Sequence, residues 1–178
     1  MTSDNKRAPR FVIDTCVIVS ALMGDTENDP HPKADASVFE LTQGEEGKSR
    51  LVLPAIVIAE LNGTGILGGT NKPQAERQKM HSAITGYLDG LHFIPAEVDW
   101  FTAQTAATLA YDHMLKPMDA LIAATALTVQ ADALLTWDDH LLRLDGKPDF
   151  TVPVRKPVDG GGQGAFDLAG PGFDPLQN

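Results

Sequence analysis

The sequence predicts an α/β fold in which helices cover both faces of a parallel β-sheet of about four to five strands. Short apolar runs rich in β-branched residues alternate along the chain with longer helical segments. That alternation is typical of parallel sheets, because parallel strands are joined by crossover helices. The length of 178 residues and the hydrophobic fraction of 43% suit one domain of about 150 residues with tails.

The elements follow from local pattern and turn residues. Strands are expected at 11–13, 50–53, 91–94 and 133–136, with an edge strand at 150–152. Helices are expected at 17–23, 34–42, 55–61, 74–88, 98–114 and 117–127, with one more helical turn around 141–144. Pro54 and Pro117 suit the first position of a helix, where the missing N–H is not needed.

The remaining segments lack these patterns. Residues 1–9 are expected to be a disordered lead, 10–156 the folded domain, and 157–178, which are dominated by Gly, Pro and Asp, a disordered tail. Turn residues predict a loop at 24–32, and the glycine-rich segment 63–72 predicts a flexible connection or lid.

Composition excludes several classes of protein. No apolar run approaches the roughly 20 residues that cross a bilayer, and no apolar segment of a secretory signal follows the first residues, so a cytoplasmic protein is expected. The single cysteine, Cys16, excludes an internal disulfide and a thiolate metal cluster, and a small buried apolar role is expected for it. The net charge of -10 argues against a large basic surface for nucleic acid. It does not exclude a nuclease whose acidic site binds cations, and it would suit a basic protein partner.

Four acidic residues are expected to meet at one edge of the sheet. Asp14 and Asp138 directly follow strands, and Glu60 lies in the second turn of a helix entered from a strand. Asp119 lies in the first turn of the helix that leads into the strand at 133–136, so that turn lies at the same edge. In open parallel sheets, ligands bind beyond the carboxyl ends of the strands. The topology therefore brings these acids together.

Clustered carboxylates repel one another when ionised and dry, so either their pKa values rise or they bind cations. Carboxylates and water are the ligands that Mg²⁺ and Mn²⁺ prefer. One or two such ions would polarise a phosphoryl oxygen and generate hydroxide from water, which predicts metal-assisted phosphodiester hydrolysis. The histidines show no ligand spacing and are expected in surface or packing roles; they are His31, His81, His92, His113 and His140.

Each acid also has a purely structural explanation. The helix macrodipole favours Asp119 near a helix start, Asp14 can be a turn residue, and Asp138 can cap a following helix. Glu60 is harder to explain this way, because an ionised side chain on an apolar face is rarely buried unpaired. Asp139 is the alternative to Asp138 as the fourth acid.

For each side chain beside the four acids, the sequence also leaves two alternative roles. Thr15 and Thr136 would either orient carboxylates or a metal-bound water, or bond to the local backbone. The ring of Trp137 would either stack on a nucleic-acid base or pack against other side chains of the protein. Lys116 would meet a phosphate or be a solvated charge before a helix.

Four motifs occur in the order and context of a known family. They are Phe11-Val12-Ile13-Asp14-Thr15, Ile58-Ala59-Glu60-Leu61, Met118-Asp119-Ala120-Leu121-Ile122-Ala123-Ala124-Thr125-Ala126 and Leu135-Thr136-Trp137-Asp138. Together they resemble the PIN-domain ribonucleases, in particular the VapC-type toxins of toxin–antitoxin pairs, from about residue 11 to 152. The resemblance implies a three-layer α/β/α fold and Mg²⁺- or Mn²⁺-dependent endonucleolytic cleavage of RNA that leaves a 5′-phosphate and a 3′-hydroxyl.

Carried over by position, Asp14, Glu60, Asp119 and Asp138 match the acidic quartet of the family, with Asp14 and Asp119 as direct metal ligands. The resemblance also implies a homodimer held inactive by a cognate antitoxin, often through a basic side chain that reaches into the active groove. The chain departs from the family at Cys16, where Asn or Ser is common, and in the greater length of residues 24–35 and of the tail.

Two other functions compete with this one. A haloacid-dehalogenase-type phosphatase also begins with a strand ending in Asp, but Cys16 occupies the second position of its Asp-x-Asp pattern. A catalytically silent PIN-like module that binds RNA or a protein would have no need of four clustered acids.

Overall fold

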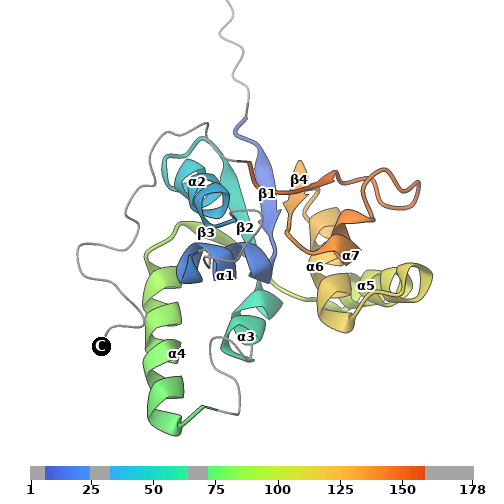
Figure 1. Cartoon of the computed structure of the whole chain (residues 1–178). Helices are drawn as coiled ribbons and strands as arrows, with labels where there is room; N and C mark the ends of the chain where they lie inside the picture. The colour runs from blue at the N-terminus through green and yellow to red at the C-terminus, as the bar shows by residue number, and fades with distance from the viewer. Residues whose placement is uncertain (1–6, 25–32, 64–71, 159–178) are drawn as a thin grey trace, which may run out of the picture.

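A single five-stranded sheet forms the centre of the protein (Figure 1). The computed structural model describes residues 7–24, 33–63 and 72–158. The strands are β1 (Arg10–Ile13), β2 (Arg50–Pro54), β3 (Phe93–Ala96), β4 (Ala133–Leu135) and β5 (Val154–Arg155). Their order in the sheet is β3-β2-β1-β4-β5, and every neighbouring pair is parallel. The predicted class, a parallel α/β sheet, is confirmed.

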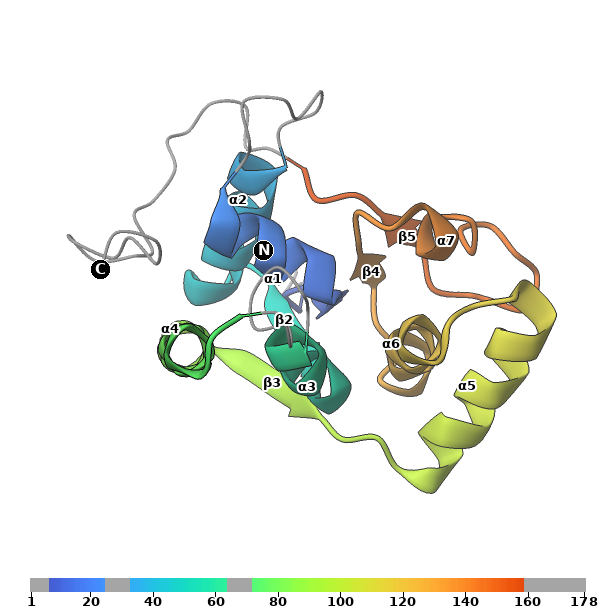
Figure 2. The same ribbon diagram turned by 60° about the horizontal axis from the view of Figure 1, so that its bottom comes forward.

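Helices lie on both sides of this sheet. In the described part of the chain they are α1 (Thr15–Met23), α2 (Ala34–Glu45), α3 (Ala55–Gly63), α4 (Gln74–Asp89), α5 (Trp100–His113), α6 (Pro117–Thr128) and α7 (Asp139–Leu142). Helices α1 and α2 pack together on one side of β1, and α5 and α6 pack together on the other (Figures 1 and 2). None of these helices is long and apolar enough to cross a membrane.

Several predicted boundaries are wrong, three of them at β2, β3 and β5. The edge strand is β5 rather than 150–152, where Phe150 and Val152 are buried in the core instead. The third strand begins at Phe93, two residues later than expected, because the backbone N–H and ring of His92 bind the carboxylate of Glu45. Pro54 ends β2, paired in register with Ala96, rather than starting the next helix. Pro117 begins α6, as predicted.

Several predicted segments fall outside the described residues. They are most of the lead (1–6), most of the two loops (25–32 and 64–71) and most of the tail (159–178).

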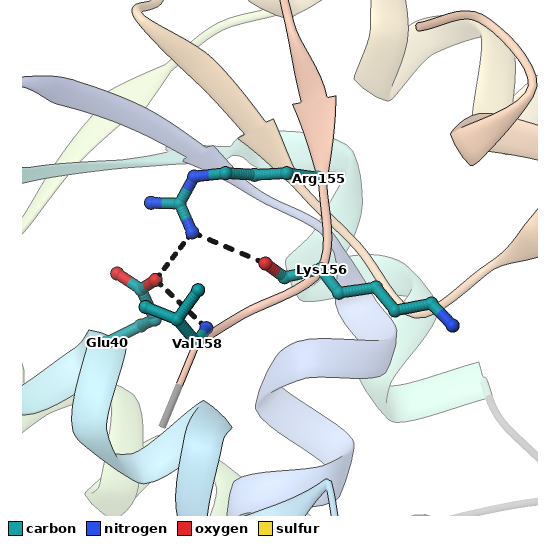
Figure 3. Close-up of polar contacts among 4 residues, drawn as sticks. All are labelled: Glu40, Arg155, Lys156 and Val158. Atoms are coloured by element: carbon teal, nitrogen blue, oxygen red, sulfur yellow. Dashed lines mark hydrogen bonds and ion pairs between the residues drawn. The ribbon is translucent and has the colours of Figure 1, made fainter. Parts of the chain in front are cut away.

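Glu40 attaches the last described segment to α2 (Figure 3). Glu40 is 3% exposed, and its carboxylate accepts hydrogen bonds from Arg155 Nη1 at 2.7 Å and from the backbone N–H of Val158 at 3.3 Å. The guanidinium of Arg155 also lies over the ring of Phe11, with 4.8 Å between Cζ and the ring centroid. A buried carboxylate is tolerated when it is paired in this way. The pair therefore fixes the short strand β5 against both the sheet and α2.

Candidate active site at the carboxyl edge of the sheet

Asp14 lies where the two central strands end. It follows β1 directly, and its backbone N–H donates to the carbonyl of Leu135 at the end of β4, at 3.1 Å. Its side chain is 4% exposed and makes no capping bond to α1. Instead, Oδ2 accepts from Thr136 Oγ1 at 2.6 Å and from Cys16 Sγ at 2.7 Å. The carboxylate is thus oriented by residues from both strand ends.

Thr136 connects two of the predicted acids. The hydroxyl that donates to Asp14 also accepts from the backbone N–H of Asp138 at 2.9 Å. Thr136 is fully buried, so its bond to Asp14 is protected from water, while the bond from Asp138 is partly buried. Of the two roles predicted for this residue, orienting a carboxylate and bonding to the local backbone, it performs both.

Glu60 enters the site from α3. Thr15, the first residue of α1, donates through Oγ1 to Glu60 Oε2 at 2.5 Å. The carboxylate of Glu60 is close enough for its charge to raise the pKa of both Asp14 and Asp119. The helix entered from β2 therefore brings its acid to the same edge as β1, as the topology predicted.

Asp119 lies in the first turn of α6, partly buried. Its pKa is raised, mainly by burial and then by the charges of Asp138 and Glu60, while Lys116 acts in the opposite direction. These interactions place Asp119 in the electrostatic field of the other acids. Lys116, the residue before α6, is exposed and moderates the negative charge of this edge.

Asp138 is the better placed of the two candidates for the fourth position. Its Oδ1 accepts from the backbone N–H of His140 at 2.6 Å, so it also caps α7, the structural role predicted as its alternative. Its charge acts on Asp119, while Asp139 is exposed. The structure thus brings together Asp14, Glu60, Asp119 and Asp138, with Thr15 and Thr136 between them.

Burial raises the free-energy cost of ionising the carboxyl groups of this site. The pKa of Asp14 is raised from its ordinary value of 3.8 to about 6, chiefly because the side chain is buried, and the charge of Glu60 adds to the shift. Hydrogen bonds from Cys16 and Thr136 act in the opposite direction but do not cancel it. Carboxylates in such surroundings take up protons or bind cations.

The donor set fits a hard divalent cation. Within residues 7–24, 33–63 and 72–158, no three His, Cys, Asp or Glu side chains are placed to enclose a metal ion. A closed cage of protein ligands is not what Mg²⁺ requires, because this ion is usually bound through one or two carboxylates and keeps several waters. Oxygen donors without a histidine or thiolate set suit Mg²⁺ or Mn²⁺ better than zinc.

Cys16 has a polar role that the sequence reading missed. Besides donating to Asp14, its sulfur accepts from the backbone N–H of Trp137 at 3.1 Å and lies 3.5 Å from Thr136 Oγ1. Burial and the neighbouring charge of Asp14 raise the pKa of the thiol well above its ordinary value, so it stays protonated and able to donate. Its position two residues after a strand-end acid, in the first turn of a helix, is a weak sequence signal that by itself did not indicate this contact.

Trp137 is anchored beside this network. Its ring nitrogen Nε1 donates to Ser37 Oγ at 2.9 Å, and its partly buried ring packs against the core. Lys33 Nζ lies 6.0 Å from the ring centroid. These contacts support the packing role predicted for Trp137. Three histidine rings make pairwise polar contacts instead of a cluster: His81 with Asn62, His92 with Glu45, and His113 with Asp149. His140 is exposed, and His31 lies outside the described residues.

The arrangement is that of a parallel α/β protein with acidic residues at the carboxyl ends of its strands, which is the edge where ligands bind in open parallel sheets. The family model for the PIN domain matches residues 11–147. The chain therefore belongs to the PIN-domain family, whose members are generally nucleases.

Solved structures share this fold at low sequence identity. VapBC2 from Rickettsia felis, bound to a DNA fragment from its promoter, is 17% identical with a TM-score of 0.58, covering 83% of this chain and 98% of that one. A toxin–antitoxin complex from Klebsiella pneumoniae is 18% identical with a TM-score of 0.56, covering 83% and 98%. FitAcB from Neisseria gonorrhoeae is 22% identical with a TM-score of 0.56, covering 83% and 97%. No curated protein matches the chain.

Proposed function

We propose that this protein is a Mg²⁺- or Mn²⁺-dependent endoribonuclease and the toxin of a VapBC-type toxin–antitoxin pair. The observation that carries the proposal is the meeting of four acids from four separate segments at the carboxyl edge of the sheet, where the charges of Asp138 and Glu60 raise the pKa of Asp119. A structural role explains any one of these acids alone. It does not explain why four carboxylates that repel one another lie at the same edge of the sheet. Membership of the PIN family supports the same reading.

The residues have distinct roles in this proposal. Asp14 and Asp119 would hold the ion directly, and Glu60 and Asp138 would complete the acidic set. Bound there, one or two ions would supply Lewis-acid polarisation of a phosphoryl oxygen and activation of water. Thr136 orients the carboxylate of Asp14 and Thr15 that of Glu60, each through a hydrogen bond from its hydroxyl. Such orienting bonds fix the geometry of carboxylate ligands.

The toxin assignment rests on family likeness and on charge. The solved complexes with this fold include toxin–antitoxin pairs. A net charge of -10 suits an antitoxin segment that carries a basic side chain into the acidic site. The proposal includes a homodimer, a cytoplasmic location, and a PIN domain of residues 10–156 between a short lead and the tail at 157–178.

A nuclease assay on the purified chain tests the enzymatic part. RNA and DNA substrates are incubated with Mg²⁺, with Mn²⁺ and with a chelator. Cleavage is expected for RNA only when one of the two ions is present. Asp14→Asn and Asp119→Asn should abolish cleavage while leaving the fold intact, and Asp139→Asn is the matched control because this neighbouring acid is exposed. Undiminished cleavage by either folded variant would contradict the assignment. RNA binding without any cleavage would favour the silent module.

The toxin role has its own test. Induced expression should slow growth, and co-expression of a small protein encoded beside this gene should restore it. If expression leaves growth unchanged and no such partner is encoded, the nuclease assignment can survive but the toxin role does not.

A further inference from the structure

Lys116 is an exposed cation beside the acidic edge of the sheet. It is the N-cap residue of α6, and Asp119 lies three positions further on, in the first turn of that helix. The N-cap residue and the third helical residue lie on the same side of a helix start. The charge of Lys116 accordingly acts on Asp119, where it opposes the increase in pKa that burial and the other acids cause.

The turn between α5 and α6 holds the backbone of Lys116 in place (Figure 2). Met114 ends α5 in the left-handed region, with a φ of 53°, and Leu115 after it is buried in the core. Pro117 fixes its own φ and restricts the residue before it to extended conformations. Lys116 has such a conformation, with φ −66° and ψ 153°. The backbone of Lys116 is therefore fixed between a buried leucine and a proline, while its side chain is exposed.

The ammonium group of Lys116 is not paired within the protein. In the described part of the chain it makes neither an ion pair nor a hydrogen bond. A lysine whose only role was to neutralise the acids would be expected to pair with one of them. Under the proposed function a metal ion neutralises these acids, so they do not require Lys116, and its charge is available to an anion from outside the protein.

The substrate of the proposed function is such an anion. RNA has a negative charge on every phosphate, and it must approach an edge with four carboxylates on a chain whose net charge is -10. Two basic side chains, Lys116 and His140, act on Asp119, and the effect of Lys116 is the larger. A lysine ammonium binds phosphate oxygens as a point charge and does not distinguish between bases.

We propose that Lys116 binds a phosphate group of the RNA next to the bond that is cleaved. This inference rests on the proposed ribonuclease function and adds to it a residue that positions the substrate. The bound phosphate does not react, so the contact is the same in the ground state and in the transition state. Interactions of this kind contribute to substrate binding and not to the rate of the chemical step.

Steady-state kinetics of RNA cleavage test this contact. Lys116→Gln keeps a long polar side chain and removes the charge, so it should raise KM roughly tenfold and leave kcat unchanged, as expected for the loss of one charge-assisted hydrogen bond. Lys116→Arg keeps the charge and should restore most of the loss in KM. Lys79→Gln is the matched control, because it removes one positive charge from an exposed position of α4, and it should behave like the wild type.

RNA binding without cleavage gives a second measurement. In the inactive Asp14→Asn protein with Mg²⁺, adding Lys116→Gln should raise the Kd for RNA by a similar factor. The slope of log Kd against log salt concentration should become shallower by about 0.7, the value for one phosphate contact on a single strand. The loss should be the same for RNAs of different sequence, because a phosphate contact does not read the bases.

A titration with Mn²⁺ in the absence of RNA separates this role from a structural one. Lys116→Gln should not weaken Mn²⁺ binding, because removing a cation does not reduce the attraction of the acids for a metal ion. Weaker Mn²⁺ binding would mean that the substitution displaces Asp119, and it would overturn the inference.

Four other results would also overturn it: a KM and a salt slope that Lys116→Gln leaves unchanged, a fall in kcat with KM unchanged, an equal effect of Lys79→Gln, and no recovery with Lys116→Arg. The two proposals can fail separately. If the wild type cleaves no RNA with either ion, the proposed function fails and this inference fails with it. If the wild type cleaves RNA and Lys116→Gln does so equally well, this inference alone fails.

Discussion

Thr136 Oγ1 donates a hydrogen bond to Asp14 Oδ2 at 2.6 Å, although the two residues are 122 positions apart in the chain. The same hydroxyl accepts from the backbone N–H of Asp138. One buried threonine thus sets the relative positions of two strand-end acids. The first prediction concerns this bond.

Thr136→Val keeps the shape of the side chain and removes the hydroxyl. The variant should lose about 1–3 kcal/mol of unfolding free energy, because the partly buried N–H of Asp138 then lacks its acceptor. Metal affinity should fall roughly 10- to 100-fold, as is typical when a bond that orients a ligand is removed. Chemical denaturation and Mn²⁺ titration would measure the two effects. Thr136→Ser keeps the hydroxyl and should restore most of the metal affinity; equal affinities for Val, Ser and wild type would contradict the orienting role.

Asp14 should make the metal-free protein less stable as the pH rises. Its pKa in the folded protein is about 6, above the ordinary value of 3.8, so the folded state binds this proton more tightly than the unfolded state. The stabilisation is complete below about pH 4 and is lost as the pH rises through 6. The difference of about 2 units corresponds to about 3 kcal/mol over the whole range, roughly half of it between pH 5 and 7.5. The raised pKa of Asp119 acts in the same direction.

Denaturation of the metal-free wild type and of Asp14→Asn at several pH values would measure this effect. The variant should gain stability relative to the wild type as the pH rises from 5 to 7.5. Adding Mg²⁺ at pH 7.5 should stabilise the wild type more than the variant, by mass action. Parallel pH profiles for the two proteins would show that folding does not raise the pKa of Asp14.

Gly44 should be required for the packing of α2 on the sheet. A Cβ at this position would lie 2.3 Å from Leu51 Cδ1 and 2.5 Å from Leu51 Cγ, and Leu51 is fully buried. Alanine improves helix propensity by about 1 kcal/mol, but overpacking of a core commonly costs about 1–3 kcal/mol, so Gly44→Ala should be destabilising. Gly86→Ala in α4 meets nothing within 4 Å and should be stabilising. Thermal melting of both variants would check these opposite signs.

Removing one partner of the Glu40–Arg155 pair should be more damaging than neutralising both. Arg155→Met leaves the buried carboxylate of Glu40 without its cation, which should cost about 2–4 kcal/mol of unfolding free energy, since Arg155 itself is partly exposed. The double variant Glu40→Gln with Arg155→Met should recover part of that loss. A double-mutant cycle by chemical denaturation would measure the coupling. Additive effects would mean that the pair contributes nothing beyond its separate side chains.

The sequence supported the parallel sheet and the common edge of the four acids because both follow from alternation and connectivity. Asp14 and Asp138 directly follow strands, so their edge was predictable without any knowledge of packing. Strand β5 was misplaced because Phe150 and Val152 alternate like a strand, whereas the position of Val154–Arg155 depends on the distant Glu40. Long-range partners of this kind leave no local pattern.

The contacts of single side chains also could not be predicted from the sequence. Cys16 resembles a small apolar residue in its surroundings, and only the ends of β1 and β4 lying side by side show that its thiol meets Asp14 and the backbone of Trp137. The misplaced boundaries of β2, β3 and β5 have the same cause. Pro54 remains in β2 because β3 pairs with it, a tertiary contact that overrides the usual place of proline at a helix start.

The distance in sequence between Asp14 and Asp138 has a consequence for protein synthesis. The first acid leaves the ribosome early, but β4 and Thr136, which orient it, are among the last parts of the domain to be made. Domains fold as units once their segments are available. A growing chain therefore has no assembled acidic edge until β4 and Thr136 have been made, and whatever chemistry this edge performs begins only when translation of the domain is nearly complete.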